Sequence, residues 1–123
     1  PDLGPIFTVL GMYAKGRTRI YNAARLRYKE SDRIAAMEQE LQKFGVDITT
    51  TQDEILINAG PPYRCDGELS GHTDHRIVMS LTVAALCADA PAVIDGAECV
   101  AKSYPNFFED IRKIGGRIEV IAP

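Results

Sequence analysis

The segment Lys29-Glu30-Ser31-Asp32-Arg33 stands at the start of the most clearly delimited helix in this chain of 123 residues. Behind it, apolar residues recur at helical spacing, and they are Ile34, Met37, Leu41 and Phe44. Ser31 is predicted to cap this helix, and Gly45 to follow its last turn. The unpaired backbone N–H groups of a helix start favour an anion, and here they coincide with cationic side chains. The segment therefore predicts an anion-binding site.

Two further segments bring cations to predicted helix starts, namely Thr73-Asp74-His75-Arg76 and Ala101-Lys102-Ser103-Tyr104-Pro105. Thr73 is predicted to cap an apolar helix, and Ser103 an amphipathic one. Three such starts in one small domain indicate a site for a heavily charged anionic ligand. An arginine at a helix start is unfavourable unless an anion offsets its charge, so we expect Arg33 and Arg76 to share one anion.

The rest of the chain predicts an α/β (α+β) fold made of two repeated units, residues 1–62 and 63–123 approximately. The first helix, over residues 3–14, is apolar on nearly every side and is expected to be buried. Short strands are predicted over residues 18–21, 46–50, 54–58, 68–69, 92–95 and 117–121. The two halves align element by element, which indicates two copies of one folding unit. Corresponding helix starts should then lie at the same end of the domain.

Composition limits the function classes. Hydrophobic residues make up 46% and charged residues 25% of the chain, as in a globular protein, and no apolar run reaches membrane-spanning length. The net charge of −3 argues against nucleic-acid binding. The stretch from Arg17 to Arg33 nevertheless holds six basic residues against two acidic ones, which suits a small anion. We expect a cytoplasmic location and free cysteine thiols. Because the chain starts abruptly at Pro1, inside a helical pattern, it is expected to be part of a longer protein.

Several side chains near the cations allow more than one interpretation. Glu30 is either a structural counter-charge or a proton-transfer group. Asp74 is explained by the preference of helix first turns for acids, whereas Asp2 would lie beside Arg33 if the repeat holds. His72 and His75 are spaced like metal ligands, but no third ligand follows and the adjacent Arg76 would repel a cation. We therefore predict no metal and a hydrogen-bonding role for His75.

Three segments in register closely resemble the 5-enolpyruvylshikimate-3-phosphate (EPSP) synthase family, namely Lys29 to Ile34, Asp74-His75-Arg76 and Lys102 to Phe108. Pro1-Asp2 and Ala14-Lys15-Gly16 fit the same family. Proteins of this family have two domains with the active site between them, and each domain holds three βαβαββ units around buried parallel helices. The resemblance implies that residues 1–123 are the last two units of the domain that contains the C-terminus.

The resemblance also implies an activity, the transfer of the enolpyruvyl group of phosphoenolpyruvate to the 5-hydroxyl of shikimate 3-phosphate with release of phosphate. The implied catalytic residues are Asp2, Glu30 and Lys102. The implied substrate-binding residues are Lys29, Arg33, His75 and Arg76. Neither a metal nor an organic cofactor is implied, and Arg25 and Arg27 receive no substrate role.

Partners and alternatives follow from the same resemblance. The missing N-terminal domain of the same chain would be the partner, the complete protein is expected to be a monomer, and the isolated chain is expected to be inactive. One alternative is the related enolpyruvyl transferase that acts on UDP-N-acetylglucosamine. Another is a non-catalytic anion-binding module. A purely structural domain would leave the clusters of acids and cations unexplained.

Overall fold

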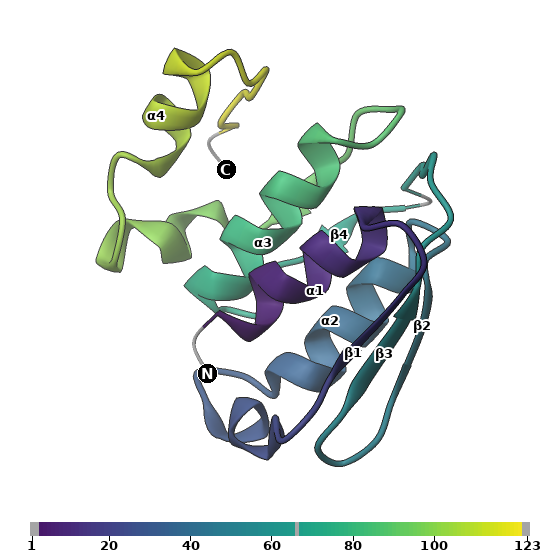
Figure 1. Cartoon of the computed structure of the whole chain (residues 1–123). Coiled ribbons are helices and arrows are strands. Elements are labelled where there is room, and N and C mark those ends of the chain that lie inside the picture. Colours follow the sequence, from purple (N-terminus) through teal and green to yellow (C-terminus); the bar gives the residue numbers. More distant parts are fainter. Residues whose placement is uncertain (1–2, 66, 122–123) are drawn as a thin grey trace.

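The computed structural model describes residues 3–65 and 67–121 and shows a mixed fold of helices and short strands (Figure 1). The α-helices are α1 (Gly4–Tyr13), α2 (Arg33–Gln42), α3 (His75–Leu86) and α4 (Phe107–Lys113). Two 3-10 helices are η1 (Ala24–Tyr28) and η2 (Ala97–Lys102). The strands are β1 (Arg17–Ile20), β2 (Asp47–Thr50), β3 (Ile55–Asn58), β4 (Leu69–Ser70) and β5 (Ile94–Asp95). This element content confirms the predicted α/β (α+β) class.

The first half of the chain builds an antiparallel sheet in the order β1-β3-β2. Ile57 of β3 pairs with Thr18 on one side and with Ile48 on the other. Side chains of a strand alternate between the two faces of a sheet, so Ile55 and Ile57 point to the same face, where both are buried. That face carries the helices.

Helices α1, α2 and α3 lie side by side, with α1 and α2 against the sheet and α3 against both of them (Figure 1). The starts of α2 and α3 meet, since Arg33 is bonded to Asp74. The later parts of α1 and α3 also meet, since the Tyr13 hydroxyl donates to the Ala84 carbonyl at 2.9 Å. All three helices therefore run in the same direction. Strands β4 and β5 pair in parallel on either side of α3 in the sequence, which makes a βαβ unit.

The apolar stripe of α2 is buried as predicted, and its four residues are at most 2% exposed. The N-cap is Asp32 rather than Ser31, because the Asp32 side chain accepts from the Ala35 N–H at 3.0 Å. The cap of α3 is likewise Asp74 rather than Thr73. Gly45 follows the end of α2 with φ 83°, a conformation in which glycine has no steric penalty.

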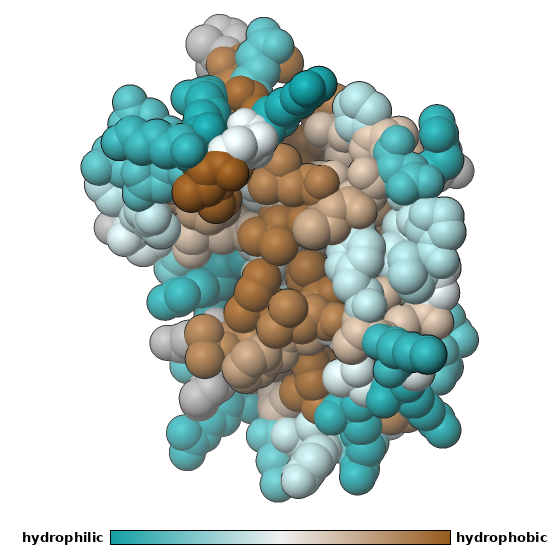
Figure 2. Space-filling model, turned by 45° about the horizontal axis from the view of Figure 1, so that its top comes forward, coloured by the Kyte–Doolittle hydropathy of each residue, from teal (hydrophilic) through white to brown (hydrophobic). Residues whose placement is uncertain are grey.

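Helix α1 is buried on one side only, which corrects the expectation that it is buried all round. Val9 and Met12 are fully buried, whereas Leu3, Phe7 and Leu10 are 51%, 48% and 56% exposed. Figure 2 shows hydrophobic residues gathered in a continuous band on the face that α1 and α3 present. No element of the described chain covers this band, so the apolar pattern of α1 exceeds what the fold of this chain buries.

The end of the chain differs most from the prediction. The last helix starts after Asn106 rather than Ser103, because residues 97–102 already form η2. Residues 117–121 do not form the predicted strand. An extended segment needs a neighbouring strand to complete its backbone hydrogen bonds, and the described residues provide none for this segment. None of the helices described here is both long enough and apolar enough to cross a membrane.

Candidate active site

The centre of the site is a buried ion pair between the starts of α2 and α3. Arg33 is the first residue of α2, and its side chain is 2% exposed, while Asp74 is fully buried. The Arg33 Nε donates to Asp74 Oδ2 at 2.9 Å, and its Nη2 donates to Oδ1 at 3.1 Å. Two parallel bonds fix the plane of the guanidinium as well as its position. The predicted charge cluster at the start of α2 therefore exists, but its arginine is held by a carboxylate of the protein.

Asp74 receives two further hydrogen bonds. The Ser31 hydroxyl donates to Oδ2 at 2.7 Å, and the Arg76 backbone N–H donates to Oδ1 at 3.0 Å, which caps α3. Burial by itself raises the pKa of Asp74, but the bonds from Arg33, Ser31 and the Arg76 amide outweigh burial and leave the pKa below its usual range. Asp74 is therefore an ionised acceptor that ties Arg33, Ser31 and α3 together.

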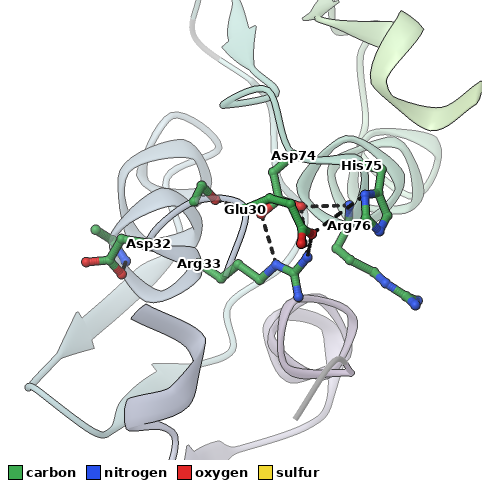
Figure 3. Close-up of polar contacts among 8 residues, drawn as sticks. Glu30, Asp32, Arg33, Asp74, His75 and Arg76 are labelled. Atoms are coloured by element: carbon green, nitrogen blue, oxygen red, sulfur yellow. Dashed lines mark hydrogen bonds and ion pairs between the residues drawn. The ribbon is translucent and has the colours of Figure 1, made fainter. Parts of the chain in front are cut away.

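Glu30 lies on the solvent side of this pair. Its Oε2 accepts from the Arg33 Nη2 at 2.6 Å, and its side chain is 52% exposed. The same oxygen is 3.7 Å from the Nδ1 of His75. Figure 3 shows Glu30, in the segment before α2, and His75, at the start of α3, turned toward each other. An exposed carboxylate between an arginine and a histidine can exchange protons with solvent or a ligand, so the geometry keeps the proton-transfer interpretation of Glu30.

Glu30, Asp74 and His75 each offer a ligand atom within 4.8 Å of the others, a grouping that could hold a metal ion. The grouping differs from the His-x-x-His pair seen in the sequence, since His72 is not part of it. Arg33 already donates to both carboxylates. The positive charge that a metal would supply at this point is thus supplied by the guanidinium, and the donor set does not favour a metal centre.

The other predicted site residues lie around this cluster to different extents. Arg76 starts beside Asp74, but its guanidinium extends away from Arg33 (Figure 3). It lines a shallow hollow of about 260 Å³ whose other walls, Leu3, Met79 and Phe107 among them, are mostly apolar. Lys29 directly follows η1 and is exposed. The backbone of Lys102 ends η2, which packs against α3. The Lys102 side chain and Asp2 lie outside the described residues.

Two structural roles were missed in the sequence. Ser31 serves Asp74 rather than the start of its own helix. Arg27 donates to Asp32 at 2.9 Å and to the Thr51 and Gln52 carbonyls, so it fastens the turn between β2 and β3 to the cap of α2. The sequence contains no signal for either contact, because both join elements that are distant along the chain or depend on which residue caps the helix.

Fold and site together define a class, an α/β domain whose parallel helices start beside a cluster of cations and acids. The family model of EPSP synthase (3-phosphoshikimate 1-carboxyvinyltransferase) matches residues 1–111. The chain belongs to the EPSP synthase family.

Individual relatives agree with this assignment. The chain is 50% identical over 121 residues to 3-phosphoshikimate 1-carboxyvinyltransferase of Methanocella arvoryzae and 48% identical over 118 residues to that of Brachyspira hyodysenteriae. The matches cover 98% and 96% of this chain but 28% of each relative. Among solved structures, EPSP synthase from Acinetobacter baumannii superposes with a TM-score of 0.90 at 40% identity over 96% of this chain and 28% of that one. The chain therefore spans about 28% of the length of these relatives.

Proposed function

We propose that this chain supplies part of the active site of an enzyme that transfers the enolpyruvyl group of phosphoenolpyruvate to the 5-hydroxyl of shikimate 3-phosphate. The observation that carries the proposal is the cluster of Arg33, Asp74, Glu30 and His75 at the joined starts of α2 and α3. In this cluster the Arg33 guanidinium is fixed in orientation, and the Glu30 carboxyl group is exposed. Such an arrangement suits a reaction that binds an anion and moves a proton beside it.

Arg33 and Arg76 are the proposed partners of the phosphoenolpyruvate carboxylate. In the structure Glu30 occupies the outer side of Arg33, at 2.6 Å from Nη2. A substrate carboxylate would take the place of Glu30 there, and the released Glu30 would be free to reach the methylene carbon. Arg76 would have to turn from its extended position to reach the same carboxylate. Lys29 would bind shikimate 3-phosphate, and His75 would line the phosphoenolpyruvate pocket.

The proposed chemistry is an addition followed by an elimination. The 5-hydroxyl oxygen attacks C2 of phosphoenolpyruvate, Asp2 accepts the hydroxyl proton, and Glu30 in its protonated form gives a proton to the methylene carbon. The bond between C2 and the phosphate oxygen then breaks, while the methyl group returns a proton to Glu30. Lys102 stabilises the departing phosphate, which takes up the proton held by Asp2. No metal or organic cofactor takes part, since fixed cations and two carboxylates perform these steps.

The rest of the enzyme would come from the longer protein. The hydrophobic band on α1 and α3 supports this partner, because Leu3, Phe7 and Leu10 are about half exposed and contiguous apolar surface of this kind marks an interface. In this proposal the band is covered by the further unit of the same domain, and a second domain closes the cleft. The complete protein would be a cytoplasmic monomer, and the isolated chain would not turn over.

A chimera tests the proposal. This chain replaces the matching segment of the Methanocella arvoryzae relative, and release of phosphate is measured with phosphoenolpyruvate and shikimate 3-phosphate. We expect turnover that depends on both substrates. Turnover with UDP-N-acetylglucosamine instead would show the related transferase, and binding of anions without any turnover would show a non-catalytic module.

A substitution assigns the anion-binding role. Arg76→Ala removes one charged partner of the substrate carboxylate, so the KM for phosphoenolpyruvate should rise on the order of tenfold to a hundredfold. Arg25→Ala is the matched control, because Arg25 is exposed on η1 and has no proposed substrate contact. Equal kinetics in the two variants would remove Arg76 from the site.

A further inference from the structure

Glu40 is a fully buried carboxylate that the proposed reaction does not use. Its side chain is 0% exposed. It lies on α2 seven residues after Arg33, so the two residues project from the same face of the helix, about two turns apart. Arg33 contacts the first turn of α3, and Glu40 contacts the segment that leads into it. Helix α2 thus holds the start of α3 at two points.

Three donors converge on the Glu40 carboxylate. Its Oε1 accepts from the Ser70 backbone N–H at 2.7 Å and from the Lys43 Nζ at 2.8 Å, and its Oε2 lies 2.7 Å from the His72 Nε2. Burial raises the pKa of Glu40, but these three bonds outweigh burial and leave the pKa lowered. An ionised carboxylate only accepts, so His72 must carry its proton on Nε2.

Residues 70–73, the segment before α3 that Glu40 contacts, have an unusual backbone. His72 and Thr73 have φ values of 54° and 53°, in the left-handed region that residues other than glycine seldom enter. The Gly71 N–H donates to the Asp95 carbonyl at 3.0 Å, and the Asp74 N–H donates back to the Gly71 carbonyl at 3.0 Å. Left-handed residues of this kind persist only where their surroundings hold them. Glu40 supplies two of the contacts that hold the segment, through Ser70 and His72.

We infer that Glu40 is a positioning residue, which by binding Ser70 and His72 sets the place of Asp74 and His75 against Arg33 and Glu30. The geometric part of this inference concerns the chain alone. Its kinetic consequence rests on the proposed function, because only an active enzyme has a KM to change. The two parts therefore need separate measurements.

The first measurement is amide hydrogen exchange by NMR in this chain, with Glu40→Ala compared to the unchanged sequence. The Arg76 amide is bonded to the Asp74 side chain, so displacement of the segment should expose it and accelerate its exchange about tenfold. The Ala35 amide is the internal control, because Asp32 caps it in the same way on α2. Acceleration at Arg76 but not at Ala35 supports positioning, whereas equal acceleration or none at either amide overturns it.

Two further variants keep the test decisive. Glu40→Gln retains an oxygen for the Ser70 N–H and loses the charge, so it should fold where Glu40→Ala does not and should accelerate Arg76 exchange by only about threefold. Glu38→Gln is the matched control on the same helix, because Glu38 binds Thr50 of β2 and not the segment before α3. A response to Glu38→Gln as large as the response to Glu40→Gln contradicts the inference.

The second measurement uses the chimera with the Methanocella arvoryzae relative. Glu40→Ala should raise the KM for phosphoenolpyruvate on the order of tenfold, because His75 moves away from Glu30 and Arg76 moves away from the proposed carboxylate site. The KM for shikimate 3-phosphate should change less, since Lys29 precedes α2 and does not depend on the segment. A lower kcat with both KM values unchanged indicates fewer folded molecules and overturns the positioning role.

The two failures can be told apart. An unchanged chimera without turnover, together with selective acceleration at Arg76 in the chain, rejects the proposed function and supports the positioning by Glu40. Turnover in the chimera together with identical Arg76 exchange and identical KM in Glu40→Ala supports the proposed function and rejects the inference.

Discussion

The contact between α2 and α3 and the contact between α1 and α3 join similar helices by different means. Between α2 and α3 the chain buries the Arg33–Asp74 pair and sets Glu40 against the segment before α3. Between α1 and α3 the core is apolar, and its polar link is the hydrogen bond from the Tyr13 hydroxyl to the Ala84 carbonyl. A buried ion pair contributes little net stability but fixes the orientation of the two helices that it joins. Apolar packing stabilises the folded state but does not fix that orientation. The charged contact lies where the candidate site is, which indicates that orientation matters there.

Breaking the charged contact should have the largest effect on stability. Arg33→Ala leaves the Asp74 carboxylate buried without its bidentate partner, so the free energy of unfolding should fall by about 3–5 kcal/mol. Urea unfolding followed by circular dichroism measures the change. Arg19→Ala is the control, because Arg19 pairs with Glu54 at the surface and its loss should stay within experimental error. A small loss in Arg33→Ala would show that Asp74 finds other partners.

Breaking the apolar contact should cost stability without disturbing the site. Leu81→Ala removes a fully buried side chain of α3 from the apolar core that it shares with Val9 and Met12 of α1, and it should lower the free energy of unfolding by about 2–5 kcal/mol. The ratio of the hydrogen-exchange rate of the Arg76 amide to that of the Ala35 amide should be the same as in the unchanged chain. Selective acceleration at Arg76 in this variant would mean that the apolar contact also directs the start of α3.

Acid should weaken the charged contact specifically. The pKa values of Asp74 and Glu40 are lowered in the folded chain, so the stability that they contribute is present above the unfolded carboxyl values of about 4 and is lost as the pH falls through the folded values. Asp74→Asn removes one of these carboxyls. Its free energy of unfolding should therefore fall less steeply below pH about 4 than that of the unchanged chain. Parallel curves from urea titrations at several pH values would contradict this assignment.

High pH should weaken the contact between α1 and α3, and we expect this to be the smallest of the four changes in stability. Burial, followed by the charges of Cys87, Tyr63 and Asp89, raises the pKa of Tyr13 to about 12. The contribution of Tyr13 is complete below its ordinary pKa near 10 and is lost as the pH rises through the folded value. Tyr13→Phe should cost about 1 kcal/mol at neutral pH and make stability less sensitive to alkali. Unfolding curves that respond equally to alkali in both proteins would show that Tyr13 does not carry this dependence.

Elements that depend on local sequence patterns were predicted correctly, whereas those that depend on contacts with distant residues were not. Apolar periodicity at Ile34, Met37 and Leu41 was sufficient to predict α2, and the antiparallel strands β2 and β3 were also found, because these patterns are local. The strand predicted over residues 117–121 was wrong, since a strand depends on a partner that local pattern does not reveal. The expectation for α1 failed for a related reason. Apolar residues indicate what a segment can bury, not whether this chain covers it.

The site was predictable in its members more than in its contacts. Cations at predicted helix starts indicated Arg33 and Arg76, and Glu30 was noted because it lies among those cations. The structure brings Arg33 and Glu30 together. Asp74 was interpreted as an ordinary first-turn acid, because the pattern that brought the two helix starts together did not show that a carboxylate of the protein itself would bind Arg33. Glu40 carried a signal that was available, since it falls inside the apolar stripe between Met37 and Leu41, where a charged side chain must find partners.

The close packing at Gly71 limits how this protein can change over time. A Cβ at this position would collide with the Val78 side chain and with the Asp95 carbonyl, and no rotation of a side chain relieves a clash with backbone. Two positions further along, Thr73 is exposed and open to replacement by residues that tolerate its backbone angle. Substitutions can therefore accumulate at the outer residue of this turn, while Gly71 holds the turn to one shape.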